Sequence, residues 1–357
     1  MERVKNWDAI VIGGGLIGIS LARELRKQEM RVLVVERGEP GHEASRAAAG
    51  MLAASDPHTP LPLRPLAEAS ARLYPEFVRE VEDESGRRVD LRRQGTILLL
   101  PSEEAAGCTV GEPLEERRVA ELEPRLAPPS GSVARVLLED SVDPKALIAA
   151  SVKAARHRGV DIASGSAVSE VVVEQGRATG VRSARTHYAA GAVINCAGAW
   201  SGQVAPLSLP ARPVKGQILE MAAGHGVLRH VVRWEGVVYL VPRSDGRILL
   251  GSTLEEAGFD KRTDADTLHR LQQAAAKLLP ALVGARILDA WAGLRPGTPD
   301  DLPILGATPV AGYFLATGHF MNGILLAPAT ARAMTQLIAG ASPEVDLEPF
   351  SYARFGR

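Results

Sequence analysis

The sequence predicts an α/β protein, α+β overall, in which a Rossmann-type βαβ domain is interleaved with a mixed-sheet domain. Two observations predict this class. A strand, a glycine-rich turn, a helix and a second strand follow one another within the first forty residues. Segments of the nucleotide-binding type return in the middle and at the end of the chain, and strand-rich segments lie between them.

The first forty residues define the βαβ unit. Ala9 to Ile12 is an apolar β run, Gly13-Gly14-Gly15 is a turn, and residues 16–25 have the apolar spacing of a helix. A second strand covers 31–35 and ends at Glu36. Two strands joined by a helix in this way imply a parallel sheet.

The remaining elements follow from periodicity and from helix and turn signals. We expect helices at 66–85, 143–157 (with Asp143 as the N-cap), 264–279 and the end of 318–340. We expect strands at 95–100 and 192–196, hairpins at 167–185 and within 211–257, and, after residue 100, a loop-rich stretch that contains Pro124, Pro128 and Pro129. This alternation predicts a nucleotide-binding domain formed by 1–85, 143–205 and 290–357, and a substrate-binding domain formed by 86–142 and 206–289.

Composition indicates a globular protein that binds a small molecule. The 357 residues are 46% apolar and 23% charged, and 41 Lys and Arg against 42 Asp and Glu leave a formal charge of −1. No basic block predicts a nucleic-acid or membrane partner. Residues 1–8 are charged and precede no long apolar core, so we expect a cytoplasmic protein. Cys108 and Cys196 lack metal-binding spacing, so we expect no metal site and favour two free thiols over a disulfide.

Gly13, Gly15 and Gly18 form a G-x-G-x-x-G motif between a strand and a helix. The first glycine permits the tight turn, the second lets a pyrophosphate approach the backbone, and the third lets the helix pack closely on the strand. The N–H groups of the first helical turn would face the phosphates, and Glu36 would accept from ribose hydroxyls. The motif therefore predicts a dinucleotide site.

The residues after Glu36 favour FAD over NAD. The run 41–51, Gly-His-Glu-Ala-Ser-Arg-Ala-Ala-Ala-Gly-Met, is rich in small side chains, which let a backbone lie close to a bulky planar ligand. Tight helix packing would explain the same composition. An NAD-dependent dehydrogenase therefore stays open on these residues alone.

Four motifs resemble the FAD-dependent D-amino-acid oxidase family, and most of all its glycine oxidase branch. They are Ala44-Ser-Arg-Ala-Ala-Ala-Gly-Met51, Tyr239-Leu-Val-Pro-Arg243, Trp291-Ala-Gly-Leu-Arg-Pro-Gly-Thr298 and Gly318-His-Phe-Met-Asn-Gly-Ile-Leu-Leu-Ala-Pro328. They occur in the family's order and cover the chain from end to end. Because this branch supplies the imine for the thiazole ring of thiamine, the resemblance also implies a place in thiamine biosynthesis.

The resemblance implies which residues would contact FAD. They are Leu16, Ile17, Glu36, Arg37, Ala44, Ser45, Ala49, Gly50, Met51 and Val168, with the tail residues His319, Phe320, Met321, Asn322, Gly323, Ile324 and Leu325 along the pyrimidine edge of the flavin. Neither cysteine lies in a motif like the one through which covalent relatives attach flavin. The resemblance therefore implies non-covalent FAD.

Amino-acid oxidation asks little of side chains, because the flavin accepts the hydride from Cα and the protein supplies orientation and electrostatics. Arg295 is the candidate for holding the substrate carboxylate, since its planar fork can donate two charge-assisted hydrogen bonds. The resemblance implies that Tyr239 shares this carboxylate. A helix beginning after Gly323 would direct its N–H groups at the pyrimidine oxygen, where negative charge develops on reduction. A surface ion pair for Arg295 and a packing role for Tyr239 are the structural alternatives.

Three positions depart from the glycine oxidase pattern. Met321 stands where an arginine is usual, Val237 where a histidine is expected, and Leu254 where a methionine lines the pocket. We expect a more apolar pocket with a weakened preference for glycine and better acceptance of sarcosine, D-alanine or D-proline. We expect O2 to reoxidise the flavin and give H2O2. A flavin dehydrogenase with another electron acceptor and a flavoprotein without turnover remain alternatives, and the sequence leaves a homo-oligomeric state open.

Overall fold

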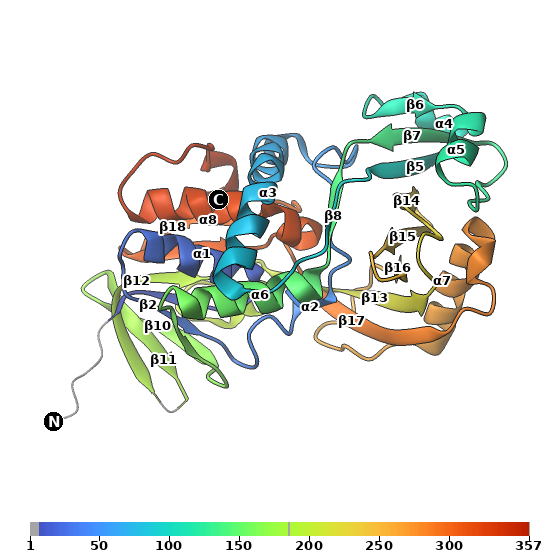
Figure 1. The fold of residues 1–357 in the computed structure, drawn as a ribbon. Coiled ribbons are helices and arrows are strands. Elements are labelled where there is room, and N and C mark those ends of the chain that lie inside the picture. Colours follow the sequence, from blue (N-terminus) through green and yellow to red (C-terminus); the bar gives the residue numbers. More distant parts are fainter. Residues whose placement is uncertain (1–6, 185, 357) are drawn as a thin grey trace.

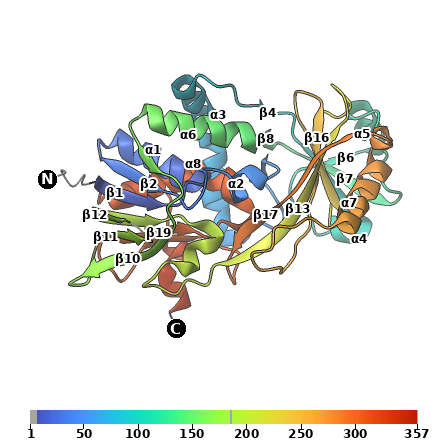
Figure 2. The same cartoon turned by 90° about the horizontal axis from the view of Figure 1, so that it is seen from below.

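The structure is a computed structural model that describes residues 7–184 and 186–356. The charged N-terminus expected from 1–8 therefore lies largely outside the described residues, as does Arg185, the expected end of a hairpin. The chain forms two lobes, each built on its own sheet, and strands run between them (Figures 1 and 2). These strands are β8 (Asp140–Val142), β13 (Arg212–Ala222) and β17 (Ile287–Gly297).

The first lobe contains the predicted βαβ unit. β1 (Trp7–Ile12) lies between β2 (Val32–Val35) and β12 (His187–Asn195), and both pairings are parallel. The other strands of this sheet extend it on both sides: β9 (Asp161–Ala163), β10 (Val168–Glu174), β11 (Arg177–Ser183), β18 (Ile304–Ala307) and β19 (Tyr313–Thr317). The parallel sheet and the 167–185 hairpin are thus confirmed as far as the chain is described.

Residues 9–12 of strand β1 are continuously apolar because both faces of the strand are covered there. Ala9 and Val11 belong to the core beneath the helices, whereas Ile10 and Ile12 belong to the core on the opposite face. Side chains alternate between the faces of a strand, so a strand buried on both sides reads as a continuous apolar run. This burial fixes the position of the glycine turn that follows β1.

Helices pack together on one face of this sheet (Figure 1). They are α1 (Leu16–Lys27), α3 (Arg64–Ser85), α6 (Pro144–His157) and α8 (Gly323–Ile338). Asp143 caps α6 as predicted, since its carboxylate accepts from the backbone N–H groups of Lys145 and Ala146 at 2.9 and 3.2 Å. All five predicted helices are confirmed, including α7 (Ala265–Leu278) in the other lobe.

The second lobe is a mixed sheet in the order β17-β13-β16-β15-β14-β5-β7-β6. Its other strands are β5 (Thr96–Pro101), β6 (Glu112–Leu114), β7 (Ser132–Leu137), β14 (Val231–Trp234), β15 (Val238–Pro242) and β16 (Arg247–Gly251). The stretch expected to be loop-rich also holds α5 (Glu116–Leu122), so that expectation was only partly right. A small sheet of β3 (Met51–Leu52), β8 and β4 (Leu91–Arg92) lies between the lobes.

The two faces of the second sheet have different partners. Leu219, Leu240 and Leu250 pack with α7 (Ala265–Leu278) on one face. Ile218 and Leu249 point to the other face, where they meet Ala49 and Met51 from the first lobe. The division of the chain into domains at residue 290 remains a prediction, and β17 crosses that boundary while pairing with β13 along its length.

Candidate active site

A cavity between the lobes brings together most of the predicted site residues. From the first lobe it is lined by Gly13, Gly15, Leu16, Ile17, Glu36, Arg37, Ala44, Ser45, Ala49, Gly50, Met51, Val168, His319, Phe320, Met321, Gly323 and Ile324, and from the second by Tyr239 and Arg295. Three predicted residues do not line it. Gly18 packs against the turn, Asn322 precedes α8, and Leu325 points into the core of the first lobe.

The glycine turn is shaped by its contact with Cys196, the residue that follows β12. Gly13 has φ of +103°, and a Cβ there would lie 2.5 Å from the carbonyl oxygen of Cys196. A Cβ on Gly18 would overlap the carbonyl oxygen of Gly13. Gly18 therefore allows close packing of α1 on the turn, which is the role expected of the third glycine in the motif.

Two polar side chains line the end of the cavity formed by the glycine turn and the start of α1, where the motif predicts the phosphates. Ser45 Oγ, on the short helix α2 (Ala44–Ala47), accepts from the N–H of Leu16 at 2.8 Å. Glu36 accepts from the N–H groups of Gly14 and Gly38 at 2.7 and 2.8 Å. Each carboxylate oxygen has a second lone pair, so Glu36 can still accept from a ligand hydroxyl. The Ser45 hydroxyl likewise keeps its proton free to donate.

Trp200 is a cavity residue that the sequence prediction missed. The guanidinium of Arg37 lies 3.9 Å from the centre of the Trp200 ring, and the Phe259 ring packs on Trp200 with a centroid distance of 5.2 Å. Phe259 belongs to the second lobe. The stacked rings therefore bring the β16–α7 connection, residues 252–264, to the rim of the cavity.

The tail segment forms another wall, and α8 begins there at Gly323 as predicted. His319 is buried, and burial lowers the pKa of its imidazole to about 3, so the ring is neutral near pH 7. Its Nε2 lies 3.2 Å from Thr330 Oγ1. Met321 is 62% exposed at the cavity rim and carries no charge.

Arg295 lies at the other end of the cavity, on β17, where it pairs across the sheet with Val214. Its guanidinium donates to Ser252 Oγ at 2.7 Å and to the carbonyl of Thr253 at 3.1 Å. A Cβ on Gly216 would overlap this guanidinium. A glycine inside β13 therefore provides the space that Arg295 occupies.

Tyr239 lies on β15, opposite Gly251 of β16. A Cβ on Gly251 would overlap the Tyr239 hydroxyl, so this second strand glycine provides the space for the ring. Burial raises the pKa of Tyr239. The positive charge of Arg295 and a hydrogen bond with Ser252 act in the opposite direction but do not outweigh burial. The phenol is therefore a neutral hydrogen-bonding group, and Ser252 links it to Arg295.

Two expected pocket residues lie elsewhere. Val237 and Leu254 are 42% and 64% exposed, and neither is among the cavity-lining residues of the described chain. The expectation that they make the pocket more apolar is therefore wrong in this structure, because both side chains point to solvent. Of the three departures from the family pattern, only Met321 changes the cavity.

The sequence matches the model of the family described as FAD dependent oxidoreductase over residues 8–337. The chain belongs to this family. It is 35% identical to glycine oxidase from Pseudomonas putida over 98% of both chains, and 31% identical to the hydrogen cyanide synthase subunit HcnC from Pseudomonas aeruginosa over 98% and 97%. The crystal structure of glycine oxidase from Geobacillus kaustophilus superposes with a TM-score of 0.91 at 34% identity, covering 98% of this chain and 99% of that one.

Membership of the FAD-dependent oxidoreductases confirms the predicted cofactor and fold, and the relatives confirm the resemblance to glycine oxidases. The cavity fits FAD on its own features. Its phosphate end has the glycine turn and the start of α1, and its wall is so close-packed that a Cβ on Gly293 would lie 2.5 Å from Ala47 Cβ. Among the described residues no cluster of His, Cys, Asp or Glu could hold a metal ion, and no helix is long and apolar enough to cross a membrane.

Proposed function

We propose that the protein binds FAD non-covalently in the cavity between the lobes and oxidises the C–N bond of glycine or another small amino acid. The product would be an imine that water converts to an oxo acid, and O2 would be the electron acceptor. The observation that carries the proposal is the pair of Arg295 and Tyr239 at one end of a cavity whose other end has the glycine turn and Glu36.

Arg295 would bind the substrate carboxylate. Ser252 and Thr253 hold one side of the guanidinium, and an arginine has five N–H donors, so others remain for a ligand. Burial makes this charge costly without an anion, and it lowers the pKa of Arg295, which nevertheless stays protonated. A carboxylate would supply the missing partner, and the Tyr239 hydroxyl would donate to the same group.

FAD, when bound, supplies the hydride acceptor. The chain's own contribution is orientation and exclusion of water, because the substrate end is walled by Ile218, Tyr239 and Met51. Neither the neutral His319 nor Tyr239 is placed to take a proton as a strong base, so the substrate amine would bind in its neutral form. The N–H groups at the start of α8 would stabilise negative charge on the ring.

The test is anaerobic titration of the purified flavoprotein with glycine, sarcosine, D-alanine and D-proline. Bleaching of the visible flavin bands by at least one of them is expected, and the relative kcat/KM values would rank the four. An oxygen electrode then separates O2 from another acceptor. Flavin bands that persist with all four amino acids would remove the amino-acid oxidase proposal and leave a flavoprotein of this family.

A further inference from the structure

Two motif residues have no role in the site described above. Arg243 and Trp291 share motifs with Tyr239 and Arg295, yet neither is among the described residues that line the cavity. Arg243 lies four residues after Tyr239, and Trp291 lies four residues before Arg295. Residues four apart in extended chain point to the same face and are about 13 Å apart. Both side chains therefore face the first lobe, as Tyr239 and Arg295 do.

Arg243 and Trp291 both bind the backbone of the cavity wall. Arg243 Nη2 donates to the carbonyl oxygen of Ala49 at 2.5 Å, and Trp291 Nε1 donates to the carbonyl oxygen of Ala47 at 3.0 Å. These carbonyls lie in the segment 44–51, which lines the cavity from Ala44 to Met51. Two residues of the second lobe thus fix two peptide groups of the first lobe.

Arg243 contributes less to stability than an apolar side chain would at this buried position. Arg243 is 4% exposed, and its Nη1 has no hydrogen-bond partner in the described part of the chain. A buried guanidinium that is not fully hydrogen-bonded is typically less stabilising than an apolar residue of the same size. Its place on the carbonyl of Ala49 points to a requirement for the position of that peptide.

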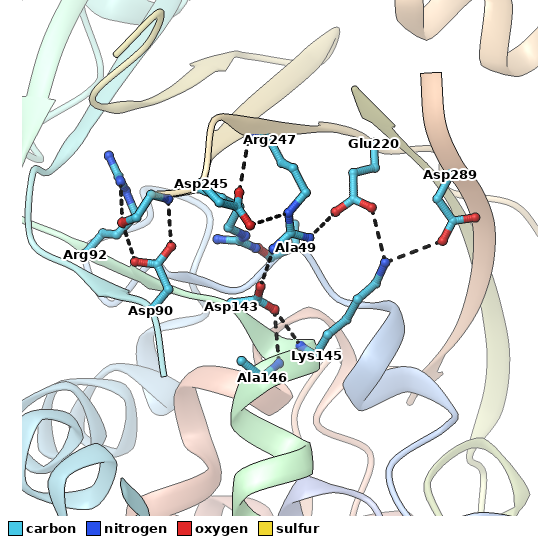
Figure 3. Close-up of polar contacts among 12 residues, drawn as sticks. Ala49, Asp90, Arg92, Asp143, Lys145, Ala146, Glu220, Asp245, Arg247 and Asp289 are labelled. Carbon is cyan, nitrogen blue, oxygen red and sulfur yellow. Dashed lines mark hydrogen bonds and ion pairs between the residues drawn. The ribbon is translucent and has the colours of Figure 1, made fainter. Parts of the chain in front are cut away.

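Charged neighbours hold the second contact in place. Lys145 Nζ lies 3.8 Å from the centre of the Trp291 ring, and it bridges Glu220 and Asp289 at 3.5 Å each (Figure 3). Arg247 in turn joins Glu220 to Asp143 at 2.5 and 3.0 Å. This ion network keeps the indole oriented so that its N–H meets the carbonyl of Ala47.

We propose that Arg243 and Trp291 are positioning residues that hold the part of the cavity wall against which the flavin would bind. They hold the 47–49 backbone by its carbonyls. The strands β15 and β17 also carry Tyr239 and Arg295, the residues proposed to bind the substrate carboxylate. Because a peptide group is planar, fixing its carbonyl fixes the whole group. The part of the proposal that concerns the substrate rests on the proposed function. The part that concerns the flavin rests only on membership of the FAD-dependent family.

The test compares Arg243→Met, Arg243→Lys and Trp291→Phe with the parent holoenzyme. The first readout is FAD affinity and the visible spectrum of bound flavin, which need no turnover. We expect FAD to bind about 10-fold more weakly to Arg243→Met and Trp291→Phe, with shifted flavin bands, and partial recovery in Arg243→Lys. The second readout is stopped-flow reduction, where the limiting rate is expected to fall about 10-fold while the Kd of the amino acid changes less than about 2-fold.

Matched controls are Arg92→Met and Trp234→Phe. Arg92 lies in the same charged region (Figure 3), where it donates to Ser244 Oγ and to the carbonyl of Arg229. Trp234 packs against the core of the second lobe. Both controls should keep the parental flavin spectrum. Parental affinity, spectrum and reduction rate in Trp291→Phe and Arg243→Lys would overturn the proposal, even if Arg243→Met does not fold. If amino acids do not reduce the parent, the proposed function fails while the first readout still tests the positioning role.

Discussion

At the scale of single residues, the substrate end of the cavity depends on one guanidinium. Arg295→Met should raise KM for the amino acid about 100-fold, because two charge-assisted hydrogen bonds of about 1.5 kcal/mol each are lost. Arg295→Lys should raise it less, since an ammonium cannot donate in the same planar fork. Steady-state kinetics and the flavin spectrum together check this. An unchanged KM in Arg295→Met would show that the carboxylate binds elsewhere.

Ser252 should have a smaller effect of the same kind. Its Oγ accepts from Arg295 at 2.7 Å and meets the Tyr239 phenol, so Ser252→Ala would leave the guanidinium less restrained without removing its charge. We expect KM to rise several-fold, about 1 kcal/mol, with kcat little changed. Ser244→Ala, in the turn after β15, is the control and should keep the parental KM.

Glu139 predicts a pH-dependent stability. It is buried, its carboxylate accepts from the N–H of Ser55 at 3.0 Å, and burial raises its pKa from 4.5 to about 7. Between pH 4.5 and 7 the folded state then binds more protons at this site than the unfolded state. The free energy of unfolding should therefore fall as pH rises through this window, by at most about 3 kcal/mol.

Replacing this carboxyl by an amide tests the pH dependence directly. Glu139→Gln keeps the acceptor oxygen and cannot ionise, so its stability relative to the parent should be higher at pH 8 than at pH 5. Urea unfolding at both pH values measures the difference. The exposed Glu103→Gln serves as the control, and a parent–variant difference that does not change with pH would contradict the assignment.

At the scale of elements, α8 depends on α3. Pro328 lies inside α8 and has no N–H for the carbonyl of Ile324, which instead accepts from the hydroxyl of Tyr74 at 3.1 Å. Ser70 Oγ donates to the carbonyl of Leu325 at 2.6 Å and accepts from the N–H of Ala329 at 3.2 Å. Two hydroxyls of α3 therefore supply hydrogen bonds to backbone groups of the turn around Pro328.

Ser70→Ala should destabilise the protein by about 1–3 kcal/mol, because it removes two hydrogen bonds to buried backbone groups of α8. Ser151 provides a matched control, since it is equally buried and its Oγ has no hydrogen-bond partner in the described structure. Ser151→Ala should be neutral or slightly stabilising. Equal unfolding free energies for Ser70→Ala and Ser151→Ala would contradict the bridging role.

Elements with strong local signals could be predicted from the sequence, whereas pairings between distant segments could not. Asp143 and Pro144 mark the start of α6, and the glycine motif places β1 and α1. Nothing local shows that β14 pairs with β5, which lies more than 130 residues earlier in the chain. The short β6 and α5 were missed because neighbouring prolines indicated loop, and tertiary packing outweighed that local preference.

The residues of the candidate site also divide into those that could be predicted from the sequence and those that could not. The resemblance placed most of the predicted residues on the cavity, but Gly216 and Gly251 were missed, because the need for space appears only when a neighbouring strand supplies the side chain. A glycine inside an otherwise apolar strand was the available signal. Val237 and Leu254 were misplaced because the orientation of loop residues cannot be read from a motif.

At the scale of the whole molecule, the cavity exists only where the lobes meet, and the β16–α7 connection crosses its rim. Phe259 packs on Trp200, and Lys261 pairs with Glu43 at 3.0 Å, so the connection is attached to the first lobe at two points. Trp200 and Glu43 both line the cavity. Opening this side requires both contacts to break.

The double change Phe259→Ala and Lys261→Ala should therefore speed FAD release about 10-fold. An aromatic pair contributes about 0.5–1.5 kcal/mol and an exposed ion pair up to about 1 kcal/mol, and 1.4 kcal/mol corresponds to a factor of ten. Release of flavin fluorescence after dilution measures the rate. Arg262→Ala is the control, because Arg262 pairs with Asp260 inside the same connection and should leave release unchanged. If the double variant releases FAD at the parental rate, the β16–α7 connection does not retain the cofactor. Contacts with the first lobe alone would then hold FAD.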